Sequence, residues 1–99
     1  MAAFSKKLIS RINSIIEGML GDYDIESTHI EVAEDASGDE AIFIDLNYRL
    51  SAREFDPAVI NAVLSAVSTM LIENGEHRFP DIRHHLPRGQ KVKSVVRAA

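Results

Sequence analysis

An uncharged stretch, PAVINAVLSAVSTMLI at positions 57–72, constrains the fold of this chain more than any other feature. Asp56 suits the N-cap of a helix, Pro57 suits its first position and Gly75 suits its end, so we expect a helix over 57–74. A helix on the surface of a globular protein normally carries charged residues on its outer face. We therefore expect this helix to be covered on two sides, one by a sheet and the other by a second helix or another subunit.

The polar side chains of this helix form a single strip in which nothing is ionisable. We expect this strip to mediate self-association, and a two-fold homodimer is the commonest outcome for a self-complementary surface. The alternative is a monomer in which the first helix covers the same face. The predicted self-association residues are Asn61, Ser65, Ser68 and Ile72.

Hydrophobic periodicity predicts another helix at the start of the chain. Apolar residues in the stretch 4–20 recur at the spacing of one helical face. Ser5 suits its N-cap, and Gly21 is expected to end it in the left-handed conformation.

Alternating apolar residues predict a β-hairpin from 24–33 and 41–50, joined by an acidic loop. A register that places Ile30 opposite Ile44 puts His29 opposite Asp45 on the other face of the hairpin. We interpret this His–Asp pair as a surface contact between neighbouring strands.

Together these elements predict one small α+β domain, because 99 residues is the size of a single domain. Residues 1–75 form the α-β-β-α core, with both helices on one face of an antiparallel hairpin. Residues 76–99 form a basic extension that contains prolines and histidines. We expect it to be irregular, pinned to the core by Phe79, Ile82 and Leu86, with a short third strand at 91–96.

Charge is divided unevenly along the chain, whose net charge is -4. Residues 1–75 hold 5 Lys/Arg and 13 Asp/Glu, for a net charge of -8, whereas residues 76–99 hold 6 and 2, for +4. Such a basic end either contacts an anionic partner or folds back onto its own acidic body. The residues predicted for an anionic contact are Arg78, Arg83, Arg88, Lys91 and Lys93.

An RNA-contacting domain is the alternative function for this basic end. The order helix–strand–strand–helix–strand is similar to that of K-homology RNA-binding domains. The one Gly-x-x-Gly spacing of the chain, at Gly18 and Gly21, lies at the end of the predicted first helix and not in a separate loop, so the resemblance concerns topology alone. The acidic body also disfavours a polyanion.

Metal binding and catalysis are less favoured by the sequence. His77, Asp81, His84 and His85 lie close together, but Pro80 breaks the helical spacing that would bring them to one face. The chain has no nucleophile elbow, P-loop or cysteine, so we predict a non-enzymatic protein without metal or cofactor. The lack of cysteine, of a signal peptide and of a long apolar run favours a cytoplasmic protein outside the membrane.

Overall fold

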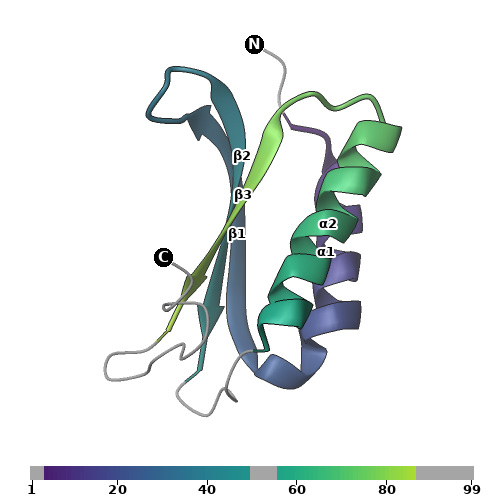
Figure 1. Cartoon of the computed structure of the whole chain (residues 1–99), viewed down its shortest axis with the longest axis vertical. Coiled ribbons are helices and arrows are strands. Elements are labelled where there is room, and N and C mark those ends of the chain that lie inside the picture. Colours follow the sequence, from purple (N-terminus) through teal and green to yellow (C-terminus); the bar gives the residue numbers. More distant parts are fainter. Residues whose placement is uncertain (1–3, 50–55, 87–99) are drawn as a thin grey trace.

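The computed structural model describes residues 4–49 and 56–86, which form two helices on one face of a three-stranded sheet (Figure 1). The predicted α+β class, with both helices on the same side of the sheet, is confirmed. The elements in chain order are α1 (Lys6–Leu20), a short 3₁₀ turn (Gly21–Tyr23), β1 (Ile25–Glu34), β2 (Glu40–Tyr48), α2 (Pro57–Glu73) and β3 (Phe79–His85).

Helix α1 begins as predicted and ends differently. The Ser5 Oγ accepts a hydrogen bond from the Lys7 amide at 3.1 Å, which confirms the N-cap. The left-handed end predicted at Gly21 is wrong, because Gly21 has a right-handed φ of -57° and continues into the 3₁₀ turn. Asp24 takes the left-handed conformation instead, at φ 59°. Aspartate tolerates this conformation better than most residues, and the Asp24 carboxylate accepts a hydrogen bond from the Arg49 Nη1 at 2.9 Å.

Helix α2 has both predicted ends. The Asp56 carboxylate accepts a hydrogen bond from the Ala58 amide at 2.9 Å, and Pro57 occupies the first turn. Gly75 follows the helix at φ 80°, a conformation that glycine adopts without the steric cost of a Cβ. The uncharged stretch is therefore a helix along its whole length.

The β1–β2 hairpin has the predicted register, with Ile30 opposite Ile44 and His29 opposite Asp45. The acidic loop between the strands is held by Asp35, whose Oδ1 accepts hydrogen bonds from two loop amides. A one-residue shift would move every side chain to the other face, so this register also decides which residues meet the helices.

The third strand differs from the prediction. The expectation of an irregular chain after Gly75 is wrong over Phe79–His85, which form β3. This strand pairs with β2 in parallel, so the sheet is mixed, with β2 in the centre. Pro80 is compatible with this position because β3 is an edge strand within the described chain, and a proline at an edge interrupts no second ladder. The strand predicted at 91–96 lies outside the described residues.

The core lies between the sheet and the two helices. Each helix contributes one row of buried side chains, and the central strand β2 contributes the buried side chains that face them. The buried side chains at the centre are Ile12, Ile16 and Leu20 from α1, Val63, Val67 and Leu71 from α2, and Ile42, Ile44, Leu46 and Tyr48 from β2. Neither helix of the described chain combines the length and hydropathy needed to traverse a bilayer.

Candidate functional site

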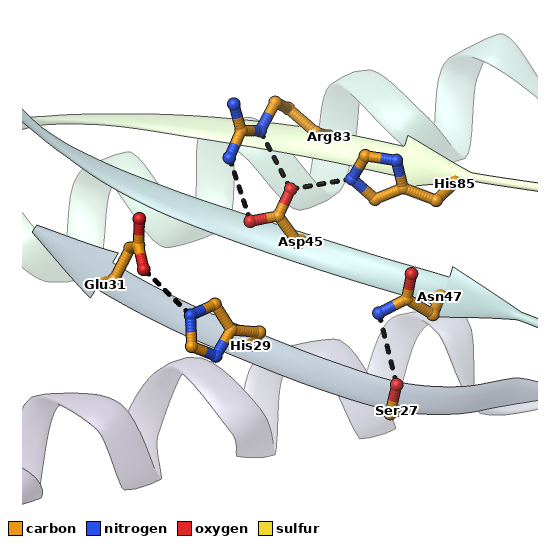
Figure 2. A network of polar contacts seen from close by, with 7 residues as sticks. All are labelled: Ser27, His29, Glu31, Asp45, Asn47, Arg83 and His85. Carbon is orange, nitrogen blue, oxygen red and sulfur yellow. Dashed lines mark hydrogen bonds and ion pairs between the residues drawn. The ribbon is translucent and has the colours of Figure 1, made fainter. Parts of the chain in front are cut away.

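The face of the sheet opposite the helices carries a polar network drawn from all three strands (Figure 2). Asp45, on the central strand, lies at its middle. Arg83 donates to both carboxylate oxygens of Asp45, from Nε at 2.8 Å and from Nη2 at 2.9 Å. His85 Nε2 lies 2.6 Å from the same carboxylate. The network joins β3 to β2 through side chains as well as through the backbone.

These contacts stabilise the charged form of Asp45. Hydrogen bonds from Arg83 hold the pKa of the Asp45 carboxyl below its usual value, against the opposing effect of partial burial. The Arg83 guanidinium also lies 4.5 Å from the centre of the Phe43 ring. Phe43 is only 9% exposed although it faces away from the helices, because this arginine covers it. Arg83 is therefore part of the structure of this face.

Arg78, like Arg83, binds carboxylates of its own chain and lies over an aromatic ring. Its guanidinium donates to Glu76 at 2.8 Å and to Glu40 at 3.3 Å, and it lies over the Phe4 ring. Hydrogen bonds from Arg78 also hold the pKa of the Glu76 carboxyl below its usual value. Two of the five residues predicted to bind an anion thus neutralise carboxylates of their own chain, and this part of the basic end folds back onto the acidic body. The other three, Arg88, Lys91 and Lys93, lie outside the described residues.

The histidines are separated by the pleat of β3. His85 faces the polar network, whereas His84 points to the helix side and shares a hydrogen bond of 2.7 Å with the Tyr48 hydroxyl. Burial lowers the pKa of the His84 imidazole to about 4 and raises the pKa of the Tyr48 hydroxyl. His77 precedes the strand. Within residues 4–49 and 56–86, no three histidine, aspartate or glutamate side chains converge on one point as metal ligands.

A second surface lies between α2 and the outer edge of β3. Two cavities of about 240 and 210 Å³ open there, and Phe79 and Pro80 border both of them. The lining from α2 is uncharged, and two large apolar side chains are left exposed, Ile72 at 72% and Phe79 at 66%. We call this region the α2–β3 surface and define it by Asn61, Leu64, Ser68 and Ile72 of α2 and Phe79, Pro80 and Ile82 of β3.

Three of the four predicted self-association residues belong to this surface. Asn61 borders the larger cavity, and Ser68 and Ile72 border the smaller one. Ser65 is exposed on the neighbouring outer face of α2. The sequence reasoning missed Phe79 as a surface residue, because it treated this residue as an anchor to the core. The neighbouring Pro80 could have indicated that Phe79 lies on an edge strand, because proline within a sheet is largely confined to edges.

Comparisons of the chain with protein-family models, with curated proteins and with solved structures gave no match.

Proposed function

We propose that this protein is a small, non-enzymatic interaction protein that self-associates through the α2–β3 surface. The observation that carries the proposal is the pair of exposed apolar side chains, Ile72 and Phe79, on either side of one cavity. Single exposed apolar residues are common on monomers, but two of them that border the same cavity beside an uncharged helix are typical of an interface. A homodimer is the simplest closed assembly for such a surface.

The fold also supports a contact beyond the core. The inner row of α2 is already covered by the sheet and by α1, and its two neighbouring faces still lack charge. The alternative of a monomer in which α1 covers the whole apolar helix does not account for Ile72. A second copy would bury this residue, and burial of an isoleucine side chain contributes about 1.5–3 kcal/mol.

The basic end is a second and separate part of the proposal. Arg88, Lys91 and Lys93 are proposed to contact an anionic partner, without help from Arg78 and Arg83, whose guanidinium groups bind carboxylates of the same chain. Titration with single-stranded RNA at two salt concentrations separates an RNA partner from an acidic protein. Binding that weakens steeply with salt supports RNA, and an absence of binding at low salt eliminates it.

Light scattering after gel filtration tests self-association directly. We expect a mass of twice the chain mass of 11.0 kDa at high protein concentration. The variant Ile72→Lys places a charge in the contact and is expected to weaken the dimer about 30-fold or more.

Thr69→Lys is the matched control, because Thr69 is an exposed residue of the same helix that borders neither α2–β3 cavity. It should raise the dissociation constant far less than Ile72→Lys does, because its side chain lies outside both cavities. A wild-type protein that stays monomeric at every concentration refutes the proposal, as does equal loss of the dimer in both variants. The proposal includes a cytoplasmic location, which fractionation of cells that express the tagged protein will test.

A further inference from the structure

We propose that two copies join along the outer edges of their β3 strands, antiparallel and centred on Ile82, to form one continuous six-stranded sheet. This inference rests on the proposed self-association and specifies its geometry. Within the described chain, β2 is the one strand that pairs with β3, so β3 forms an edge of the sheet. A strand at a sheet edge is a template for another strand.

The two edges of the sheet are not equivalent as templates. Strand β1 is interrupted by an irregularity between Ile25 and Ser27 and carries three glutamates without a lysine or arginine. Two β1 edges would therefore repel each other, and the irregularity would disturb their pairing. Strand β3 has no such irregularity, and its open face carries both signs of charge, from Asp81 and Arg83.

Charge selects one register for the β3 pair. In an antiparallel pair about a two-fold axis, the residue at the axis faces itself, and its neighbours exchange partners. An axis at Ile82 places Asp81 opposite Arg83 of the second copy and repeats this contact on the other side. An axis at Asp81 would oppose two carboxylates, and one at Arg83 would oppose two guanidinium groups. Of these three registers, only the one at Ile82 makes two Asp–Arg pairs and opposes no like charges.

Both partners are available for this exchange. The Asp81 side chain is exposed, and within the described residues its carboxylate acts on Arg83 of its own chain through charge alone, without a side-chain hydrogen bond. Arg83 binds Asp45 through Nε and Nη2, which leaves donors of its five N–H groups for a second carboxylate. The Arg83 side chain is 45% exposed, so a neighbouring strand can reach it.

The same register places the two α2–β3 surfaces beside each other. Opposed residues of an antiparallel pair lie on the same face of a sheet, so both helix layers stay on one side. Ile82 borders the larger cavity together with Ile60 and Leu64 of α2, so the apolar side chains gather along the new seam. Pro80, which has no N–H to donate, faces His84 of the second copy, near the end of the paired segment instead of at its centre.

A charge-exchange experiment tests the register. In Asp81→Arg, two arginines oppose each other on each side of the axis, and in Arg83→Asp two aspartates do. Each variant alone is expected to dimerise at least about tenfold more weakly than the wild type. Mixed in equal amounts, they should form a heterodimer at least about tenfold tighter than either homodimer, because every opposed pair is again an arginine and an aspartate. Its affinity should stay below that of the wild type, since Arg83→Asp also removes the hydrogen bonds to Asp45.

A cross-linking experiment supports the same test without altering charge. The chain contains no cysteine, so Ile82→Cys introduces a single thiol that faces its own copy. A short bis-maleimide reagent should link this variant into a covalent dimer. His85→Cys is the control, because this register separates the two copies of residue 85 by about 20 Å along the strands. Circular dichroism of each variant checks that the fold is retained.

The outcomes separate this inference from the proposed function. A wild-type monomer overturns both. A dimer that Ile72→Lys disrupts, with no heterodimer in the charge-exchange mixture and no cross-link at residue 82, keeps the α2–β3 surface as the contact and overturns the edge pairing. Rapid cross-linking at residue 85 with none at residue 82 also overturns it, because the strands then meet in another register.

Discussion

The α1–β1 side and the α2–β3 side of this molecule have similar interiors and different exteriors. Outside, α1 carries exposed charges at Lys6, Lys7, Arg11 and Glu17, whereas α2 has none from 57 to 72. A groove of about 450 Å³ between α1 and β1 is bordered by Glu17 and Glu26. The cavities between α2 and β3 are bordered mainly by apolar and uncharged residues.

The exposed apolar residues of α2 are more than its packing against the core requires. Each helix buries three aliphatic side chains against the sheet, so the two inner faces do equivalent work. The additional apolar residues of α2 therefore do not serve the interior. They lie on the helix beside β3, and the edge of the sheet formed by β3 is where we place the partner.

The largest expected effect tests the equivalence of the interiors. Leu20→Ala and Leu71→Ala each remove a leucine from the last turns of a helix, at 0% and 1% exposure. Each should lower the free energy of unfolding by about 2–5 kcal/mol, from lost burial and the cavity left behind. Urea denaturation at low protein concentration measures both. A much smaller loss for Leu71 would show that α2 is only loosely packed on the sheet.

Protonation of His84 should destabilise the β3 side at mildly acidic pH. Its folded-state pKa of about 4 lies below the usual 6.5, so the unfolded chain binds a proton between these values and the folded chain does not. The free energy of unfolding should therefore fall as pH drops from 6.5 to 4, by about 1–2 kcal/mol after allowance for partial exposure. Denaturant titrations across this range measure the slope.

His84→Phe should flatten that slope, because phenylalanine does not titrate and retains a ring beside Tyr48. His85→Gln is the control, since His85 faces the other side of the sheet. If His84→Phe keeps the full slope, then the burial of His84 is not its source.

A charge on the outer face of α2 should weaken self-association, whereas the same charge on α1 should not. Ser65→Glu and Ser14→Glu make the same change at exposed serines of the two helices. We expect Ser65→Glu to raise the dimer dissociation constant about tenfold, because Ser65 adjoins the α2–β3 surface. Sedimentation velocity at several concentrations gives both constants. Equal values for the two variants would place the contact away from α2.

The smallest expected effect compares two ion pairs. Asp45→Asn removes the charge that Arg83 binds through two hydrogen bonds, at a carboxylate only 15% exposed, and should cost about 1 kcal/mol at neutral pH. Arg49→Gln removes the exposed Arg49–Asp24 pair beside β1 and should cost a few tenths of a kcal/mol.

Thermal and urea unfolding measure both variants. The Asp45 contribution should be present above pH 3.8 and be lost as pH falls through the lowered folded-state pKa. A larger loss for Arg49→Gln would reverse the expected order of the two sides.

The sequence predicts the hairpin and both helices because their signals are local. The register of Ile30 and Ile44 follows from alternation alone, and the start of α2 follows from Asp56 and Pro57. Strand β3 escaped prediction because its inward-facing positions include Pro80 and His84, which are atypical of a strand core. Only pairing with β2 makes this segment extended.

The candidate site was predictable on α2 and not on β3. The lack of charge marks α2 in the sequence, whereas the edge position of β3 depends on which strand it pairs with. The contact between Arg83 and Asp45 could not be predicted from the sequence either. The two residues lie on different strands, and only the parallel register of β2 and β3 places them opposite each other. The edge position of β3 and the role of Arg83 both depend on contacts between segments that are distant in the sequence.

The parallel pairing of β2 and β3 implies an order of assembly. The hairpin closes through a short turn, whereas β3 is connected to β2 only through the entire α2 segment. Closing the longer connection has the greater entropic cost, so β3 should join the sheet late in folding and detach first in partial opening. Its amide hydrogens should then exchange with solvent sooner than those of β1 and β2 in dilute protein, and association along its outer edge should slow that exchange as concentration rises.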